Sequence, residues 1–355
     1  MTASGTTTNP IVSVCVPVRN EQKYIANTLD TIRSQTHEDF EVLIFDNCST
    51  DDTVEICRNY CESDGRFRLF QNQFNVGQIY NFNRCLAPAA GEFIAIRSGN
   101  DPMQPDYLKK TLALLRDDPG MGLVYSRNLQ IDASGETLEK QYLDASYFET
   151  SSDEPVAAAA TVMKRFFHPA SFFGVYRKSL LDRLQPLRHI FGSDKIFVCE
   201  ASLYSSIGCV QEVLSFERRH QRQASLEDIF SEDAVYELPQ QSIYASYEGI
   251  TPIADMIWGF AVMISRAAID NNAKARLCQI SHAVLGNHYS DNLKKEKQRV
   301  LGIFANNREL FTNEATNRIL NLNRHNYLEC VKRIQFTFPQ DHQLSTVSKA
   351  IAGLL

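Results

Sequence analysis

The feature that most limits the fold is a pair of uninterrupted apolar runs near the start of the chain. These runs are IVSVCVPV at residues 11–18 and FEVLIFD at residues 40–46, and the stretch between them repeats apolar residues at helical spacing. Apolar runs without polar alternation are typical of strands buried on both faces, and a helix between two such strands joins parallel neighbours. The sequence therefore predicts an α/β fold with a mainly parallel sheet flanked by helices.

The alternation of strands and helices continues to residue 132. We expect strands at FRLFQN (67–72), EFIAI (92–96) and MGLVYSRNLQID (121–132), and helices at TVEICRNYC (53–61), GQIYNFNRCLAPAA (77–90) and DYLKKTLALLRDD (106–118). Parallel sheets bind their ligands where the strands end. Three polar clusters follow strand ends, at residues 17–20, Asp46 and residues 98–101, and we expect all three on one rim.

The second half of the chain has a different pattern. A polar loop is expected from about Tyr142 to Pro155, and from about Leu226 strand patterns give way to amphipathic helices. The most apolar stretch, residues 252–269, contains charged residues and is shorter than the roughly 20 residues that cross a bilayer. The predicted organisation is a disordered lead-in at residues 1–10, an α/β domain at 11–225 and a helical region at 226–355, without a transmembrane segment.

Composition excludes several classes of protein. A formal net charge of -6 without a basic block argues against nucleic acid as a partner. Nine scattered cysteines, an odd number, indicate reduced thiols and not a disulfide framework. Cys57 and Cys61 have the spacing of a ligand pair, but no second pair accompanies them, so we expect them to pack a helix. The polar opening MTASGTTTNP lacks the features of a signal peptide, which favours a cytoplasmic protein.

Several ordered motifs resemble those of the family 2 glycosyltransferases with the GT-A fold. The likeness covers residues 11–225 and rests on VPVRNE (16–21), FDNCSTDDT (45–53), NVGQIYNFN (75–83) with AAGEFIAI (89–96), NDPMQPDYL (100–108), GSDKIFVCEAS (192–202) and FERRHQRQAS (216–225). The resemblance implies an inverting glycosyltransferase. Such an enzyme would move a sugar from a nucleotide-linked donor, with UDP as the expected nucleotide, to a hydroxyl of a glycan, protein or small acceptor.

The resemblance assigns the chemistry to a few residues. Inverting transfer needs a base that takes the proton of the attacking hydroxyl, and Asp194 stands in that place. Its other interpretation is the N-cap of the helix that follows, a role that Ser193 could also fill, and Glu200 is a weaker substitute as the base.

The nucleotide-binding residues follow from the same resemblance. Asp46 matches the residue that accepts from the uracil N–H, although it could equally cap the next turn. Further nucleotide contacts are expected along the first strand end and the third helix, from Pro17, Val18, Arg19, Asn20, Asn83 and Arg84. The family frequently has an arginine directly before the asparagine that matches Asn83. Here Phe82 occupies that position and Arg84 follows.

The metal motif departs from the family pattern. Family members usually show Asp, any residue, Asp, Asp where this chain reads Ser98, Gly99, Asn100 and Asp101, so that only the last carboxylate is present here. Three interpretations remain open. Asn100 and Asp101 bind Mg²⁺ or Mn²⁺ with His220; the metal is held mainly by the donor diphosphate; or arginines and His220 neutralise the diphosphate without metal. A plain turn is the simplest reading of SGND. The arginines in question are Arg97, Arg218 and Arg219.

Some expectations concern the acceptor and the class of protein. His168, in FFHPASFFG, could face the acceptor. The helices after residue 226 either form a layer packed on the catalytic domain or, around Trp258, serve acceptor docking, a homodimer or peripheral membrane contact. The alternative class is a non-catalytic nucleotide-sugar-binding or scaffold protein, suggested by the missing carboxylates. A Rossmann dehydrogenase is disfavoured because no G-x-G-x-x-G follows the first strand.

Overall fold

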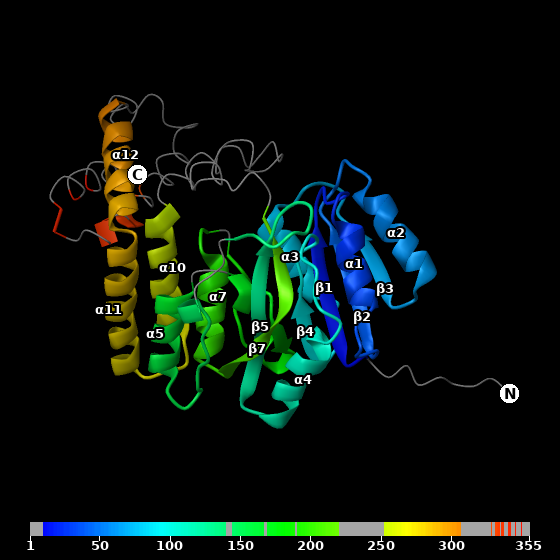
Figure 1. Ribbon diagram of the computed structural model, residues 1–355. Helices are drawn as coiled ribbons and strands as arrows, with labels where there is room; N and C mark the ends of the chain where they lie inside the picture. The colour runs from blue at the N-terminus through cyan, green and yellow to red at the C-terminus, as the bar shows by residue number, and fades with distance from the viewer. Residues whose placement is uncertain are drawn as a thin grey trace. The chain divides into compact units, whose positions relative to one another are not determined.

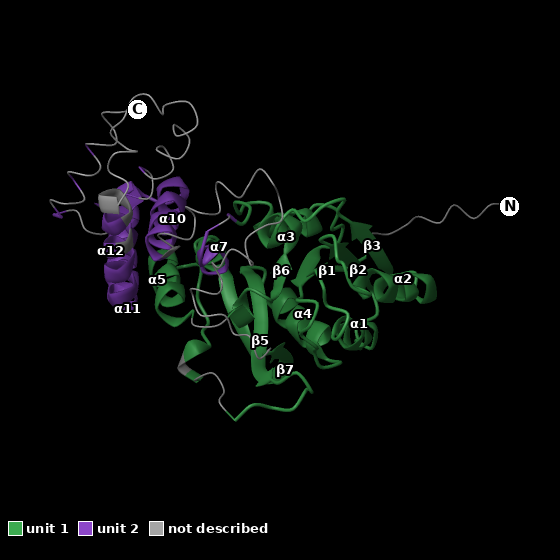
Figure 2. Cartoon of the chain, turned by 90° about the horizontal axis from the view of Figure 1, so that it is seen from above, with its two compact units in different colours: residues 1–187, 197–223 green, residues 188–196, 224–355 purple. Residues whose placement is uncertain are grey.

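A computed structural model describes most of the chain. The described residues are 10–139, 144–166, 169–188, 190–219 and 252–306, with 328, 331–333, 335–336, 340–341, 345 and 349. Two predicted site residues, His168 and His220, and residues 1–9 of the predicted lead-in lie outside this part. The chain divides into two compact units, the first made of Met1–Leu187 and Phe197–Gln223, the second of Arg188–Ile196 and Ala224–Leu355 (Figure 2).

Unit 1 contains a seven-stranded sheet (Figure 1). In chain order the strands are β1 Val12–Val18, β2 Phe40–Asp46, β3 Phe67–Gln71, β4 Phe93–Ile96, β5 Met121–Ile131, β6 Val175–Arg177 and β7 Ser206–Arg218. Their order in the sheet is β3-β2-β1-β4-β6-β5-β7. Strand β6 is antiparallel to β4 and β5, whereas the other pairs are parallel. The prediction of a mainly parallel sheet is confirmed, and six strands end at the same rim.

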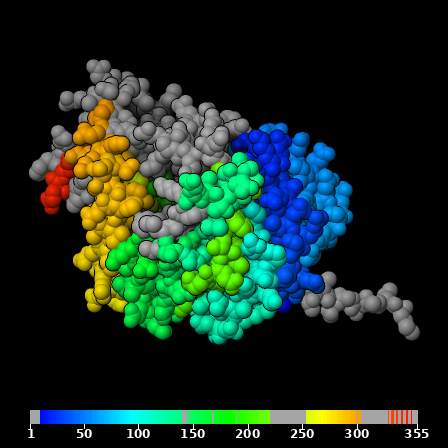
Figure 3. All heavy atoms as spheres, viewed as in Figure 1, coloured from blue at the N-terminus to red at the C-terminus, as the bar shows by residue number. Residues whose placement is uncertain are grey.

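Helices cover both faces of this sheet. The helices of unit 1 are α1 Ile25–Arg33, α2 Thr53–Ser63, α3 Gln78–Leu86, α4 Tyr107–Asp117, α5 Pro155–Arg165 and α6 Lys178–Leu181. Their buried faces follow from apolar residues at helical spacing, as in α1, where Ile25, Leu29 and Ile32 are buried against β1 and β2. On the opposite face Cys85 of α3 packs with Leu43 and other residues of β1 and β2. In the space-filling view the blue and cyan segments of unit 1 form one continuous surface (Figure 3).

The segment after residue 140 differs from the sequence prediction. A short 3₁₀ turn at Asp144–Ser146 lies within the expected polar loop, and helix α5 begins at Pro155, an element that the sequence pattern does not predict. Proline at the first position of a helix and the alanine run after it are both favourable, and the buried Ala159 and Val162 provide its packed face. The loop was identified because it is polar, and the helix was missed because its apolar residues are small.

Unit 2 is helical in its described part, as predicted. Its helices are α10 Pro252–Arg266, α11 Asn271–His288 and α12 Ser290–Asn306. Glu296 on α12 is buried, and its two carboxylate oxygens accept from the backbone N–H groups of Ile253 at 2.8 Å and Ala254 at 3.1 Å. A carboxylate at the N-terminus of a helix satisfies unpaired donors and meets the positive end of the helix dipole. Among the described helices, none has the length and apolarity to cross a membrane.

Candidate active site

The first two polar clusters meet at the carboxyl ends of β1 and β2. Asn20 follows β1 with a left-handed φ of 54°, a conformation that asparagine tolerates. Its side-chain oxygen accepts from the backbone N–H of Thr50 at 2.8 Å, and its own N–H donates to Ser49 Oγ at 2.9 Å. The backbone N–H of Asn47 donates to Val18 O at 2.9 Å. The two loops are thereby joined along the rim.

Asp46 ends β2 and is only 1% exposed. Its carboxylate accepts from the backbone N–H of Ser49 at 3.1 Å and from the hydroxyl of the same residue. Asp46 therefore holds the turn that follows it, as one of its two sequence interpretations required. An ionised carboxylate has about four acceptor positions, so these two bonds leave acceptor capacity for a further donor.

A network of asparagine side chains, which the sequence analysis missed, supports this rim. Asn72 Nδ2 donates to Asn47 Oδ1 at 3.1 Å and to Asn81 Oδ1 at 2.8 Å, and Asn81 Nδ2 donates to Phe45 O at 2.8 Å. Arg84 Nη1 donates to Asn72 Oδ1 at 2.6 Å. Buried amides bonded to one another fix the geometry of the strand ends. The concentration of asparagines after β2 and β3 was the available signal.

Asn83 is also engaged within unit 1. Its side-chain amide donates to Leu187 O at 2.9 Å and accepts from Leu187 N at 3.0 Å. Both polar ends of this side chain thus contact one backbone residue. Asn83 and Arg84, two of the predicted nucleotide contacts, are in this structure bonded to other parts of the protein.

The third polar cluster follows β4 and lies against the first. A Cβ added to Gly99 would lie 2.7 Å from Val18 Cγ1 and 3.4 Å from Glu21 Cγ, so the absence of a side chain allows this approach. Ser98 Oγ donates to Asn100 Oδ1 at 2.5 Å. Asp101 is 8% exposed, and its Oδ1 accepts from the backbone N–H of Arg218 at 2.8 Å. The expectation that the three clusters share one rim agrees with these contacts.

Two of the arginines proposed for the diphosphate are buried. Arg218 Nε donates to Asn100 O at 3.2 Å, Nη1 to Asp132 O at 3.0 Å and Nη2 to Asn27 Oδ1 at 3.1 Å. Arg97 is 2% exposed; its Nη2 lies 3.3 Å from Asp101 O and its guanidinium lies over the Tyr107 ring. These groups hold the loops together from inside. Arg219 forms an ion pair with Glu217 at 3.0 Å.

Electrostatics at this rim are dominated by buried carboxyl groups. Burial raises the pKa of Asp101 to about 6, against the opposing effect of the Arg218 backbone hydrogen bond and the Arg97 charge. Burial, with the charges of Asp101 and Asp51, raises the pKa of Glu21 to about 7, while Arg218 opposes the rise. Glu21 was not among the predicted site residues. A cation near this pair would favour the ionised carboxylates.

The described residues do not form a metal site by themselves. Within the described ranges, no group of three or more histidine, cysteine, aspartate or glutamate side chains is arranged to hold a metal ion. One oxygen of Asp101 is bonded to Arg218, and the oxygen of Asn100 accepts from Ser98. Mg²⁺ and Mn²⁺ sites of this kind use about six oxygens, so a metal here would need oxygens of a bound diphosphate.

Asp194 lies in unit 2, in the first turn of helix α7 Ser193–Ser202. The helix begins at Ser193, so Asp194 is inside the helix and is not its N-cap. Its Oδ1 accepts from the backbone N–H of Lys195 at 2.8 Å, and the side chain is largely buried. Burial raises the pKa of Asp194, and the hydrogen bond from Lys195 together with its charge opposes the rise. A largely buried carboxylate of raised pKa is suited to accept a proton.

Close glycine contacts hold the loop before Asp194 within unit 2. Gly192 has a left-handed φ of 70°, and a Cβ added there would lie 2.5 Å from Met256 Sδ on α10. A Cβ added to Gly259 of α10 would lie 2.5 Å from Ile190 Cδ1 and 2.8 Å from Ile196 Cδ1. Burial, and to a smaller extent the charge of Asp194, raises the pKa of Tyr289 at the end of α11. These contacts, invisible in the sequence, place helices of unit 2 around the loop.

Comparison with known proteins agrees with the resemblance. Residues 13–184 match the family described as Glycosyl transferase family 2. EpsH of Bacillus subtilis, named as a glycosyltransferase, is 28% identical over 228 residues, 59% of this chain and 61% of that protein. The GalNAc(5)-diNAcBac-PP-undecaprenol beta-1,3-glucosyltransferase of Campylobacter jejuni is 27% identical over 193 residues, 52% of this chain and 57% of that protein. The chain therefore spans about three fifths of the length of these relatives.

Solved structures match the fold over most of the chain. S. aureus TarS 1-349, solved in complex with UDP, has a TM-score of 0.58 and 17% identity, over 96% of this chain and 91% of that chain. The same protein in complex with UDP-GlcNAc gives the same values. At this identity the match concerns the fold alone. The sheet is thus GT-A-like, and residues 13–184 are similar to the glycosyl transferase family 2.

Proposed function

We propose that this protein is an inverting glycosyltransferase that moves a sugar from a UDP-linked donor to a hydroxyl of a glycan, a protein or a small acceptor, with Asp194 as the general base. The observation that carries the proposal is the meeting of the three polar clusters at one rim of a family 2 domain. Among the acceptors we favour a glycan, because the Campylobacter jejuni relative is named for adding glucose to a lipid-linked glycan.

The proposed reaction is a single displacement. The acceptor hydroxyl oxygen attacks the anomeric carbon, its proton passes to the Asp194 carboxylate, and the bond from the anomeric carbon to the diphosphate oxygen breaks. The electron pair of that bond leaves with UDP, and the configuration at the anomeric carbon inverts. The raised pKa of Asp194 supports its role, because a base of higher pKa takes a larger share of the proton in the transition state.

In this proposal the uracil N–H donates to the remaining acceptor position of Asp46. Pro17, Val18 and Asn20 lie at the adjoining strand end, where they would line the nucleotide pocket, and Arg19 would reach a phosphate. Asn83 and Arg84 would act on the nucleotide indirectly, through the backbone and the asparagine network that they bond. Arg218 would likewise support Asn100 and Asp101 and not touch the diphosphate.

The metal requirement defines the first prediction. Because Asp101 and Asn100 are already bonded inside the protein, we expect UDP to bind in EDTA within about tenfold, or 1.4 kcal/mol, of its affinity with Mn²⁺. Titration calorimetry of the purified protein with UDP, once with Mn²⁺ and once with EDTA, measures this difference. Binding only with Mn²⁺ would contradict this expectation and would show that the SGND turn rearranges into a metal site. Absence of binding in both would contradict the UDP proposal.

A second candidate function is a non-catalytic nucleotide-sugar-binding or scaffold protein. It is favoured by one observation: Ser98 and Asn100, which stand where the family has carboxylates, bond to each other. Such a protein would bind UDP in the titration and would release no UDP from a UDP-sugar. Both functions therefore predict UDP binding, but only the glycosyltransferase releases UDP from a UDP-sugar.

A further inference from the structure

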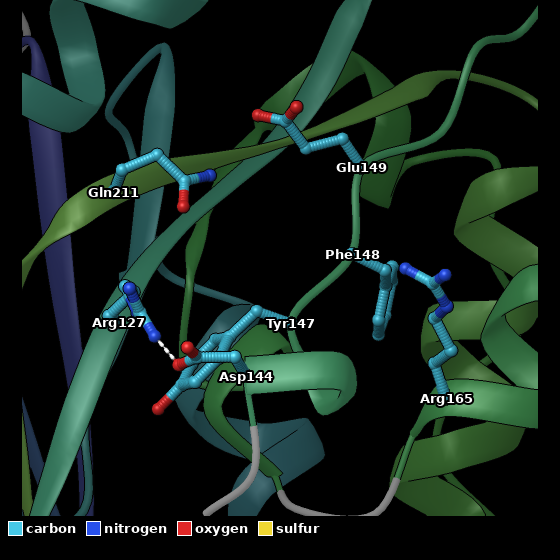
Figure 4. Close-up of a pocket in the computed structure, with 7 residues that line it drawn as sticks. All are labelled: Arg127, Asp144, Tyr147, Phe148, Glu149, Arg165 and Gln211. Atoms are coloured by element: carbon cyan, nitrogen blue, oxygen red, sulfur yellow. Dashed lines mark ion pairs between the residues drawn. The ribbon is translucent and has the colours of Figure 1, made fainter.

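A hollow lies on the outer strands β5 and β7 of unit 1, away from the rim where the three polar clusters meet. It has a volume of about 360 Å³ and is bounded by β5, by β7, by the segment 144–149 and by the end of α5 (Figure 4). Arg127 and Gln211 come from the two neighbouring strands on one side, and Glu149 and Arg165 stand on the other (Figure 4). None of these residues belongs to the site described above.

Buried hydrogen bonds hold one wall of this pocket in place. Tyr147 Oη donates to Asn128 O at 2.9 Å and accepts from Asn128 N at 3.2 Å. Tyr125 Oη donates to Phe148 O at 2.8 Å and accepts from Phe148 N at 2.7 Å. Tyr147 is therefore fixed to β5 by its side chain, and Phe148 is fixed to β5 by its backbone. A pocket formed in advance loses less entropy when it binds a ligand.

An irregularity in β7 supplies another wall. Ser126 pairs with Val210, whereas Arg127, the next residue of β5, pairs with Val213, so residues 211 and 212 have no partner on β5. Gln211 lines the pocket, and Glu212 bonds to Lys110 of α4. Bulges of this kind redirect side chains and are frequent next to functional sites.

The chemistry of the lining favours a neutral, hydroxyl-rich ligand. Two arginines, Arg127 and Arg165, are balanced by two carboxylates, Asp144 and Glu149, so the pocket has no formal net charge. A phosphate or carboxylate site needs a positive excess, and an apolar ligand needs a mainly apolar lining. The side chains here are mostly planar and polar, with several donors and acceptors each.

The individual groups have capacity left for such a ligand. Arg165 is exposed, and among the described residues its guanidinium has no hydrogen bond or ion pair. Glu149 uses Oε1 to accept from Cys209 N at 3.2 Å, and Gln211 uses Nε2 to donate to Cys209 O at 3.2 Å. Glu149 Oε2 and the single side-chain oxygen of Gln211 therefore remain available to accept from hydroxyl groups. Tyr147 adds an aromatic ring beneath Arg127, at 5.1 Å.

We propose that this pocket binds a neutral sugar unit of the acceptor glycan. The inference rests on the proposed glycosyltransferase function. In the order of the sheet β5 lies three strands from β1, which is roughly 14 Å at the usual spacing of strands. The pocket is thus separate from the proposed nucleotide site on β1, and in this proposal it contacts a part of the acceptor other than the reacting hydroxyl. It would therefore select the glycan without taking part in the chemistry.

Saturation-transfer NMR on the full chain tests the pocket without requiring turnover. The probes are the methyl glycosides of glucose, galactose and N-acetylglucosamine and their disaccharides. We expect at least one probe to bind, and binding to weaken about tenfold in Arg165→Ala and in Gln211→Ala, since each removes a hydrogen bond to the ligand. Arg116→Ala, an exposed arginine on α4, is the matched control and should bind like the unaltered protein.

Two results would overturn the proposal: no signal from any probe, or equal signals from the unaltered protein and both pocket variants. UDP titration of the same samples separates this failure from that of the proposed function. UDP binding without sugar binding would refute the proposed sugar pocket and leave the proposed nucleotide site standing. The opposite result is a protein that does not bind UDP but binds a sugar in a way that depends on Arg165 and Gln211. This result would support the sugar pocket and refute the UDP-dependent function.

Discussion

Replacement of Asp194 by asparagine is expected to lower the rate of sugar transfer by about 10²–10⁴-fold, the range that a positioned general base contributes. Asparagine has nearly the same size, and its side-chain oxygen can still accept from the backbone N–H of Lys195 at the start of α7. The helix and the loop before it should therefore persist. UDP affinity should change little, because the proposed nucleotide-binding residues belong to unit 1.

The pH profile of transfer gives this prediction a second readout. Since the pKa of Asp194 is raised, transfer by the unaltered protein should increase with pH through a midpoint above the usual range of aspartate, about 4. The Asn variant should lack this rise. Asp182→Asn, which alters a surface ion pair with Lys178, is the matched control and should retain transfer. Full activity of Asp194→Asn would assign the base elsewhere, with Glu200 as the next candidate.

Replacement of Gly192 by alanine is expected to lower the stability of the protein. An alanine at a left-handed φ costs about 1–2 kcal/mol, and its Cβ would approach Met256 Sδ to 2.5 Å in a residue only 1% exposed. Overpacking of this kind adds about 1–3 kcal/mol. We therefore expect the free energy of unfolding to fall by about 2–5 kcal/mol in denaturant titration, together with reduced transfer, because the loop carries Asp194.

The control for this prediction is Gly302→Ala on α12. A Cβ added at Gly302 meets no atom within 4 Å, so alanine should raise stability by about 0.5–1 kcal/mol, as in other helix interiors. Equal stability of Gly192→Ala and the unaltered protein would show that the loop does not need glycine there. Retained UDP affinity in Gly192→Ala would show that the substitution affects the loop before Asp194 and not the proposed nucleotide site.

Much of unit 1 could be predicted from its strands. The pattern placed strands at residues 11–18 and 40–46, and the structure has them at Val12–Val18 and Phe40–Asp46. Buried parallel strands are easy to recognise because they are continuous apolar runs. Strand β6, of three residues, is too short to form such a pattern, and it is the antiparallel member of the sheet. Its antiparallel direction depends on its pairing with β4 and β5, which no local sequence pattern shows.

The candidate site could be located but its contacts could not be predicted. Strand ends placed Asp46 and Asp101 on one rim, which the structure agrees with. Whether Arg218 faces outward depends on β7 pairing with β5 and on the turn after Ile131, whose carbonyl groups receive its guanidinium. Those partners lie more than eighty residues away in the chain. The same holds for Gly192, whose contact with Met256 joins segments that no local pattern connects.

Proton NMR of a reaction with α-linked UDP-sugars tests the central claim most directly. The purified protein is incubated with UDP-glucose, UDP-N-acetylglucosamine or UDP-N-acetylgalactosamine and with a panel of glycoside acceptors. We expect that one donor is consumed, that UDP appears, and that the new glycosidic linkage has the β configuration. An α-configured product would contradict inversion with Asp194 as the base. No UDP from any donor, in a protein that binds UDP, would contradict catalysis itself.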